Sequence, residues 1–355
     1  MGLRIQTTLL ALALGLSGCG GAQSPAAGTA QHGQRGGLAA GVSKRTVAGV
    51  RVIHKRIHAN AVVQASILID GGVAAADPAH AGAELLAMRV ATSGGPASMS
   101  KAEYSAALDE RGASVSGDVG FDTAEFSVSA VKPAFGKVWE LATAAIRNPA
   151  FRDADVENVR EQQLSALASE SDDPDNAVRN LLRDHLYAGH PYANRPSGTA
   201  ETVERLTAAD LATAWRAMWF KERITVVVVG DIDDAAVDAA VESAFKDLPS
   251  QPGWKRPAVA AVASQATALH VEERRGMPTN YILGAFPIPD RLSPDYPAIE
   301  IGLSVLSEKL FEEVRTKRNL TYAVSSRAYT RRANTGVLYV LSLIHISEPT
   351  RPERI

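Results

Sequence analysis

His80 and Glu84 are the potential metal-ligating residues whose spacing is most suggestive. They lie four residues apart, so on a helix they would share one face and could both contact a metal ion. A third ligand at a matching position is not apparent. We therefore prefer the simpler interpretation, that His80 and Glu84 are surface polar residues near the start of a helix.

A second pair of imidazoles, His185 and His190, lies five residues apart. This spacing does not place both side chains on one helical face, and Pro191, directly after His190, breaks a helix. We therefore interpret the His-Pro-Tyr segment at 190–192 as a structural loop. Neither pair predicts a metal site.

The composition is that of a packed globular protein. Of the 355 residues, 46% are hydrophobic and 21% are charged, and this length suits two domains better than one core. The 37 Lys and Arg residues against 39 Asp and Glu residues give a net charge of -2. A clustered basic excess is missing, so nucleic acid is not an expected partner.

The first 19 residues look like a lipoprotein signal peptide. Arg4 precedes an apolar run at 9–16 that is too short to span a bilayer, and Leu-Ser-Gly-Cys at 16–19 resembles a bacterial lipobox. Cleavage would leave Cys19 as a lipidated N-terminus anchored in a membrane. Because Gly20 follows rather than Asp, we expect the outer membrane, facing the periplasm of a bacterial cell envelope. An ordinary secretory signal with an incidental cysteine is the alternative.

Residues 20–45 are rich in Gly, Ala, Ser and Gln and are predicted to be a flexible tether. The first domain is expected over 46–249. One helix is expected to begin at Asp77-Pro78. Another is expected to begin at Ser100, which forms a capping box with Glu103. Strand patterns occur at 50–54, 62–70, 113–119, 123–131 and 224–231, and helix patterns at 77–90, 101–112, 134–146, 153–169, 176–187, 207–220 and 233–248.

A proline-rich linker at 250–266 precedes a second domain, expected at 267–341. The second domain echoes the first. Residues 67–72 and 282–287 have similar strand-to-turn patterns, and each is followed by a proline-containing helix start. Such a duplication predicts two similar halves, and two facing halves can enclose a cleft for a ligand.

The last segment, 342–355, contains S-L-I-H-I-S-E-P-T-R-P, which looks like translated sequencing-adapter DNA. We exclude it from the reasoning about the fold. The second domain is then expected to be truncated, because it extends over far fewer residues than the first domain that it echoes. Truncation would leave an apolar face and an open sheet edge.

Three stretches, in order, resemble the insulinase, pitrilysin and mitochondrial processing peptidase family of zinc peptidases. They are L-Y-A-G-H-P-Y with Gly-Thr at 186–199, V-V-V-V-G-D with A-F-K-D-L-P at 226–249, and L-F-E-E-V-R-T-K-R-N-L-T-Y-A-V at 310–324. The resemblance implies an α+β fold of two homologous domains, each a mainly antiparallel sheet backed by helices, with the second truncated here.

The chain departs from this family at the zinc site. Family enzymes carry H-x-x-E-H on one helix, and this chain has Glu84, Ala87 and Met88 at those places. The third ligand, a Glu on a later helix, corresponds to Ser165 or Ala166, and we assign Ala166. The resemblance therefore implies no catalytic residue, no bound metal and no cofactor on this chain, and no activity of the chain by itself.

Arg315 and Tyr322, seven residues apart, match the substrate-binding Arg and Tyr of the family's second domain. An Arg fork grips carbonyl or carboxylate oxygens, and a Tyr hydroxyl can donate to an oxyanion. In two-chain members of the family one subunit supplies H-x-x-E-H and the other supplies Arg and Tyr. A solvated helix-end cation and an edge-strand aromatic are the alternative interpretation of these two residues.

The preferred hypothesis is a lipid-anchored, non-catalytic subunit that binds a peptide substrate. It would complete the active site of a homologous catalytic peptidase, which would hold the zinc. Extended peptides would bind by strand addition, which demands little of their sequence. One alternative is a structural or assembly scaffold on the same fold, and the other is a zinc metalloendopeptidase with rearranged ligands.

Overall fold

The structure, a computed structural model, describes residues 41–263, 267–275, 279–329 and 331–342. The predicted signal peptide with Cys19, the tether up to residue 40 and the tail from 343 onward lie outside the described residues.

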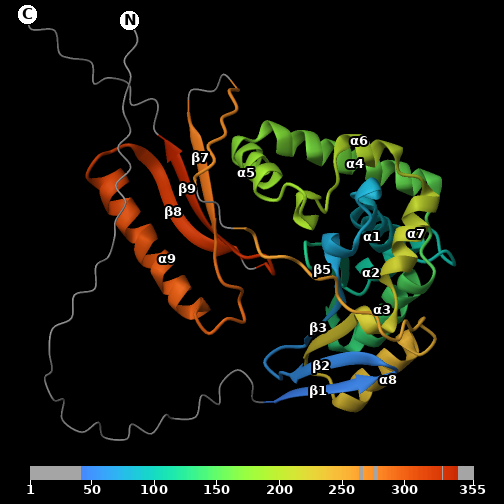
Figure 1. Cartoon of the computed structure of the whole chain (residues 1–355). Coiled ribbons are helices and arrows are strands. Elements are labelled where there is room, and N and C mark those ends of the chain that lie inside the picture. The colour runs from blue at the N-terminus through green and yellow to red at the C-terminus, as the bar shows by residue number, and fades with distance from the viewer. Residues whose placement is uncertain (1–40, 264–266, 276–278, 330, 343–355) are drawn as a thin grey trace, which may run out of the picture. The chain divides into compact units, whose positions relative to one another are not determined.

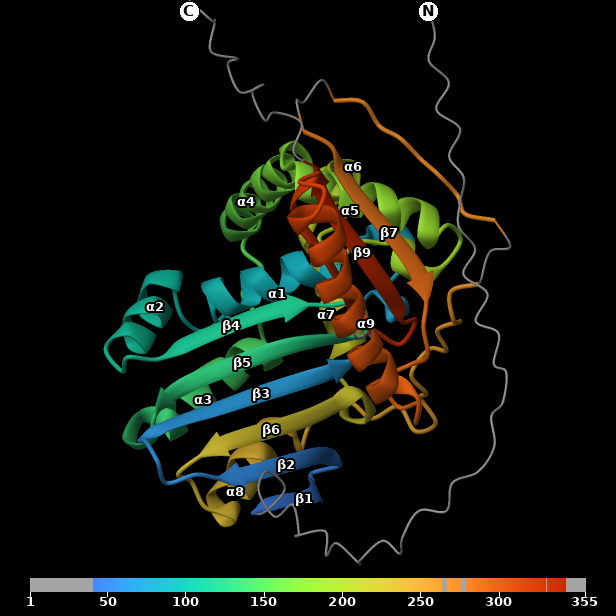
Figure 2. The same ribbon diagram turned by 90° about the vertical axis from the view of Figure 1, so that its left-hand side faces the viewer.

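A six-stranded sheet forms the centre of the first half. Its strand order is β1-β2-β6-β3-β5-β4, and every neighbouring pair is antiparallel except β2 and β6 (Figure 2). The strands are β1 (Val42–Val47), β2 (Val50–Arg56), β3 (Val62–Asp70), β4 (Ser114–Val119), β5 (Thr123–Val131) and β6 (Ile224–Gly230).

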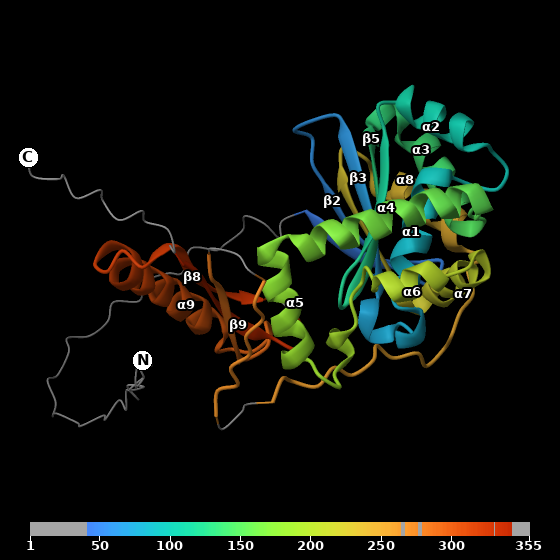
Figure 3. The same ribbon diagram turned by 90° about the horizontal axis from the view of Figure 1, so that it is seen from above.

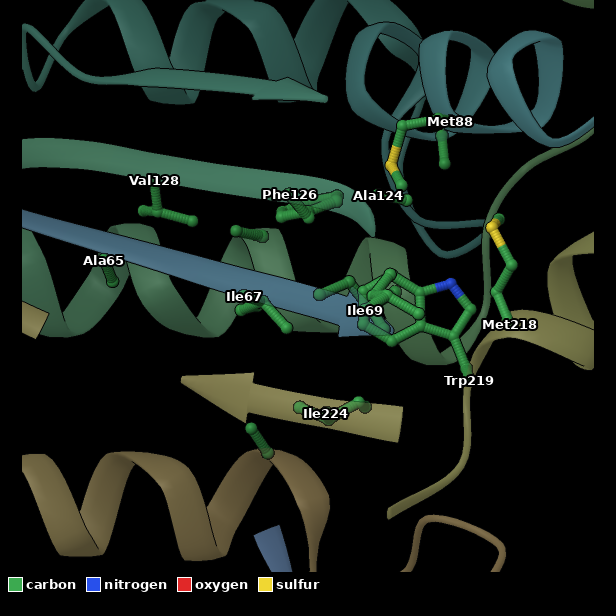
Figure 4. Close-up of a cluster of buried hydrophobic side chains, with 14 of the residues drawn as sticks. Ala65, Ile67, Ile69, Met88, Ala124, Phe126, Val128, Met218, Trp219 and Ile224 are labelled. Atoms are coloured by element: carbon green, nitrogen blue, oxygen red, sulfur yellow. The ribbon is translucent and has the colours of Figure 1, made fainter. Parts of the chain in front are cut away.

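Alternation along β3 decides which face of this sheet is buried. Val63, Ala65, Ile67 and Ile69 are fully buried, while the side chains between them are only half-buried. Successive side chains of a strand point to opposite faces, so one face is apolar and packs against helices. β5 repeats the pattern with Ala124, Phe126, Val128 and Ala130, and Figure 4 shows the cluster that the two strands form with Trp219 and Ile224.

Helices cover that apolar face, as Figure 3 shows for α1, α2, α3 and α8. None of the helices in the described ranges has both the length and the apolar character needed to cross a membrane. The helices of this half are α1 (Ala83–Gly94), α2 (Lys101–Asp109), α3 (Lys132–Arg147), α4 (Asp153–Asp172), α5 (Pro174–Leu186), α6 (Ala200–Arg205), α7 (Ala208–Met218) and α8 (Asp234–Phe245).

Two predicted helix starts, at Ser100 and at Asp77-Pro78, have different outcomes. The capping box is confirmed: Ser100 accepts from the Glu103 amide, and the Glu103 carboxylate accepts from the Ser100 amide. The helix expected from Asp77-Pro78 is wrong in its start, because only a short 3₁₀ turn, η2 (Pro78–His80), forms there. Gly82, at a φ of 94°, separates this turn from α1.

The tether also ends earlier than predicted. Residues 42–45 belong to β1, which pairs along its length with β2. Arg45 holds this edge strand to α8 through ion pairs to Asp234 at 2.7 Å and Asp238 at 2.5 Å. These partners lie far away in the sequence, so the composition of residues 20–45 gave no sign of them.

The second sheet has three strands in the order β7-β9-β8, all antiparallel (Figure 1). It repeats the β3-β5-β4 order of the first sheet, and in each case a helix follows the first strand. This confirms the predicted α+β fold of two similar, mainly antiparallel sheets backed by helices. The elements are β7 (Tyr281–Pro287), α9 (Tyr296–Leu310), the π-helix η5 (Phe311–Thr316), β8 (Thr321–Tyr329) and β9 (Thr335–Ser342).

Candidate functional site

The start of α1 is set by Gly82. A Cβ atom there would lie 2.9 Å from the Ser197 carbonyl oxygen and 3.1 Å from the Val203 side chain, and the positive φ also favours glycine. From this start, α1 turns Glu84, Ala87 and Met88 toward the protein interior. Ala87 and Met88 are fully buried, and Glu84 is 9% exposed.

Met88 fills the space beside β4. A Cβ atom on Gly117 would lie 2.3 Å from Met88 Cγ and 2.6 Å from Met88 Sδ, so the thioether lies directly against the strand's backbone. Figure 4 shows Met88 in the same buried cluster as Ala124 and Phe126. An apolar side chain therefore occupies the place that corresponds to the second His of the family motif.

Glu84 is the only potential ligand among the three α1 positions, and it is buried beside a small pocket that Asn194 and Arg195 also line. Burial raises the pKa of its carboxyl group to about 7, although the Arg223 guanidinium partly offsets that shift. Its Oε2 atom is buried without a hydrogen-bond partner. A carboxyl in such a place is readily protonated near neutral pH.

Arg223 does not pair directly with Glu84. Its Nε donates to the Asp70 carbonyl at 2.6 Å and its Nη1 to the Ala217 carbonyl at 2.6 Å, while Nη2 is buried without a partner. Arg223 thus holds the end of β3 to the end of α7. The charge that it offers Glu84 acts through space rather than through an ion pair.

His80 lines the same small pocket as Glu84, but within the described ranges no hydrogen bond or ion pair joins the two. Its Nδ1 lies 2.7 Å from an Asp77 carboxylate oxygen and its Nε2 3.7 Å from Asp210, and it sits in η2 rather than on α1. No group of three or more His, Cys, Asp or Glu side chains in the described ranges could hold a metal ion. The residues present therefore do not fit zinc.

On α4 the predicted position and the buried position differ. Ala166 is exposed, so it does not share the buried environment of Ala87 and Met88. The fully buried polar side chain of this helix is Gln163, whose Nε2 donates to the Ser197 carbonyl at 2.9 Å. The sequence signal was available, because Gln163 continues the helical spacing of Val156 and Val159, which are buried on the same face.

Arg315 and Tyr322 are brought together by two irregular elements. Arg315 lies in the π-helix η5, and Asn319, in the left-handed conformation at a φ of 51°, turns the chain toward β8. The Leu320 amide donates to the Val314 carbonyl at 3.0 Å and closes this turn. π-helical turns of this kind are often found at functional sites.

A β-bulge then presents Tyr322. Thr321 pairs with Ser342 and Ala323 with Leu341, so Tyr322 is an extra residue on β8. The buried Thr321 hydroxyl donates to the Ala323 carbonyl at 2.8 Å and fixes the bulge. Bulges re-aim side chains, and Tyr322 is left 61% exposed.

The guanidinium of Arg315 stacks on two rings, at 5.3 Å from the centre of Tyr322 and 4.8 Å from that of Phe311. Such contacts orient the guanidinium plane. No ion pair of Arg315 occurs within the described ranges; the neighbouring Glu312 and Glu313 pair with Lys317 instead. The N–H groups of Arg315 and the hydroxyl of Tyr322 are thus available to a ligand.

The loop at 190–192 is structural, as predicted. His190 Nδ1 accepts from the Tyr192 amide at 3.0 Å, and Nε2 lies 3.0 Å from the Ala260 carbonyl. The hydroxyl of Tyr192 donates to Asp122 at 2.5 Å. Both nitrogens of His190 are therefore used within the protein.

Comparison with known families agrees with this geometry. Residues 51–200 match the family described as insulinase (peptidase family M16), and residues 205–344 match the one described as the peptidase M16 inactive domain. The two matches cover most of the chain. The chain belongs to the insulinase family, peptidase family M16.

Individual relatives are distant. An uncharacterized zinc protease of Mycobacterium leprae is 28% identical over 210 residues, which make up 57% of this chain and 46% of that protein. A Helicobacter pylori protein described as the non-peptidase homolog YmxG is 21% identical over 225 residues, or 62% of this chain and 52% of that protein. The chain spans about half the length of the curated relatives it matches.

The fold is also seen in solved structures. A peptidase M16 inactive domain from Pseudomonas fluorescens superposes with a TM-score of 0.73 at 21% identity, covering 85% of this chain and 74% of that chain. The predicted fold is thereby confirmed. The expectation that the chain by itself is not an active peptidase agrees with the descriptions "inactive domain" and "non-peptidase homolog".

Proposed function

We propose that this chain is a non-catalytic subunit that binds peptide and completes the active site of a homologous zinc metallopeptidase. One observation carries the proposal: the exposed Arg315–Tyr322 pair is assembled, while buried apolar side chains stand at two catalytic positions of the family, Ala87 at the general base and Met88 at the second His ligand. A chain that keeps the substrate-binding Arg and Tyr but lacks the zinc ligands suits a subunit that binds substrate for a catalytic partner.

The two side chains have complementary tasks. Arg315 presents a charged fork that can hold a carbonyl or carboxylate oxygen of the peptide. The Tyr322 hydroxyl can donate a hydrogen bond to negative charge that develops on the scissile carbonyl oxygen. Neither group activates water, so we assign the zinc and the general base to the partner subunit.

Peptide binding by strand addition is supported by the sheet topology. β4 and β8 are terminal strands in their sheets, and each has an edge that no other described strand covers. An extended peptide can pair with such an edge through main-chain hydrogen bonds alone. We propose that the substrate is an unstructured or unfolded peptide segment with little sequence preference.

We further propose that the mature protein is held at the outer membrane, on its periplasmic side, through lipidated Cys19. The lipobox-like residues 16–19 support this. Metabolic labelling with a fatty-acid analogue should tag the protein, and Cys19→Ser should abolish the label. Failure to label the unaltered protein would remove the anchor from the account.

The subunit role is tested by joint activity. A homologous H-x-x-E-H chain from the same organism is purified alone, with this chain, and with its Arg315→Ala variant. We expect peptide cleavage only from the unaltered pair, with Arg315→Ala lowering it by about 100-fold or more. Arg318→Ala is the matched control, because Arg318 is an exposed neighbour 3.6 Å from Glu313, and it should leave activity unchanged.

Two outcomes would contradict the proposal. Stable binding of the homologous chain with no effect of Arg315→Ala on cleavage would indicate a scaffold. Chelator-sensitive cleavage by this chain alone would indicate a self-sufficient zinc peptidase with rearranged ligands.

A further inference from the structure

A cluster of arginine side chains lies between α5 and the residues Tyr329, Arg331 and Thr335, and the proposed function does not use it. Arg179 and Arg183, four residues apart on α5, line one side of a pocket. Tyr329, Arg331 and Thr335 line the other side. Among the described residues, no carboxylate lines it. We call Arg179, Arg183, Arg331 and Thr335 the arginine pocket.

Two polar atoms of this pocket lack a partner. Arg183 Nε is buried without a hydrogen bond, and so is the hydroxyl of Thr335, which is fully buried. Buried polar groups are nearly always hydrogen-bonded, and an unsatisfied one costs free energy. Both atoms can donate, so an acceptor that reaches both would remove the cost.

The charges at the pocket are poorly neutralised. Burial, together with the nearby charges of Arg195 and Arg331, lowers the pKa of Arg183 to about 10, against the opposing effect of Asp184 and Glu170. Asp184 is exposed and shared, at 3.2 Å from Arg195 and 3.6 Å from Arg183. An added anion would therefore meet an excess of positive charge.

The guanidinium groups of Arg331 and Arg179 have no acidic partner among the described residues. Within the described ranges neither forms an ion pair; Arg179 Nη1 donates only to the Asn176 side chain, at 3.3 Å. The Arg331 guanidinium lies 3.8 Å from the centre of the Phe121 ring and 4.9 Å from that of Tyr329. Stacking fixes its plane and leaves the N–H groups at its rim for hydrogen bonding in that plane.

We propose that the arginine pocket binds an oxyanion, a carboxylate or a phosphate group, through the guanidinium groups of Arg183 and Arg331 and the hydroxyl of Thr335. Guanidinium forks match the geometry of both anions. The bound anion holds α5 to Arg331 and to Thr335 at the start of β9. This site is separate from Tyr322, which lies at the opposite end of β8 from Tyr329.

Calorimetric titration of the full chain with inorganic phosphate, in a buffer of matched ionic strength, tests the proposal. A second titration uses a short acetylated peptide with a free carboxylate, and a third uses its amidated form. We expect saturable one-to-one binding of phosphate, of the free carboxylate, or of both. The amidated peptide should not bind at this site. Comparing the first two titrations identifies the source of the anion.

Arg183→Gln and Arg331→Gln should each weaken this binding about tenfold or more, because each removes a charge-assisted hydrogen bond. Arg331→Gln keeps the test valid if loss of the buried Arg183 unfolds the chain, which circular dichroism would show. Arg205→Gln, on the exposed α6 arginine paired with Glu201 at 3.2 Å, is the control and should bind normally. Absence of saturable binding to the unaltered chain, or equal binding by Arg331→Gln, would overturn the proposal.

Discussion

The guanidinium of Arg315 lies 5.3 Å from the centre of the Tyr322 ring, although neither residue is in a regular element. Arg315 belongs to a π-helix, and Tyr322 is the extra residue of a β-bulge. Two departures from regular geometry in a short segment converge on one contact. This convergence is what supports a binding role for the pair rather than a solvated helix end.

Removing only the hydroxyl of Tyr322 separates its two contributions. Tyr322→Phe keeps a ring under Arg315 but removes the donor to the carbonyl oxygen. If that donor acts in the transition state, kcat of the assembled peptidase should fall about 100-fold while KM changes little. The measurement is steady-state cleavage by the two-subunit complex. Tyr281→Phe, the same change on β7, is the control, and equal effects of both variants would contradict a specific role for Tyr322.

The buried carboxyl of Glu84 predicts a pH dependence of stability. Its pKa is raised from 4.5 to about 7 by burial, so the folded chain favours the protonated form over the ionised form. The contribution of Glu84 to the free energy of unfolding is therefore fully present below pH 4.5, the pKa in the unfolded chain. It is lost as the pH rises through about 7, the pKa in the folded chain. At pH 8 the ionised carboxylate should cost about 3 kcal/mol.

Glu84→Gln removes this titration without changing the size of the side chain. We expect the variant to match the unaltered chain near pH 4.5 and to be more stable by up to about 3 kcal/mol at pH 8. Urea unfolding at several pH values measures the difference between the two chains, and Glu201→Gln on the surface of α6 is the control. A difference that does not change with pH would show that Glu84 is ionised in the folded chain throughout.

The contact between Met88 and Gly117 predicts a non-additive pair. Met88→Ala removes a fully buried side chain and should destabilise by about 2–5 kcal/mol. Gly117→Ala places a methyl group against Met88 Cγ and should cost about 1–3 kcal/mol. In the double variant the new methyl group enters the space that Met88 left, so the combined loss should fall short of the sum by about 1 kcal/mol or more.

Gly136→Ala on α3 provides the matched glycine control. A Cβ atom there would have no neighbour within 4 Å, so alanine should stabilise the helix by about 0.5–1 kcal/mol. Denaturant unfolding of these four variants and of the unaltered chain gives the comparison. Strictly additive losses for Met88→Ala and Gly117→Ala would mean that the two residues do not share the space beside β4.

The regular strands and most helices could be predicted because their signals are local. The alternation of Val63, Ala65, Ile67 and Ile69 fixes both a strand and its buried face. The start of α1 could not be predicted, because Asp77-Pro78 begins a 3₁₀ turn as readily as a helix. Gly82, packed against Ser197 and Val203 from a distant segment, decides where the helix begins.

The candidate site was only partly visible in the sequence. Arg315 and Tyr322 were found through the family motif, yet nothing local predicts the bulge that exposes Tyr322, because it depends on the register with Leu341 and Ser342. On α4, helical spacing from Val159 would have predicted Gln163 as the buried polar position. The family motif gave Ala166 as the third-ligand position; this residue is exposed, and the assignment stays a prediction.

The most direct test of the account is the zinc content of the purified chain. The chain is incubated with zinc, dialysed, and measured by elemental mass spectrometry alongside a homologous chain that carries H-x-x-E-H. The account predicts zinc well below one equivalent in this chain and one equivalent in the homologue. One tightly held zinc ion per chain, lost in Glu84→Gln and accompanied by peptide cleavage that a chelator abolishes, would contradict it.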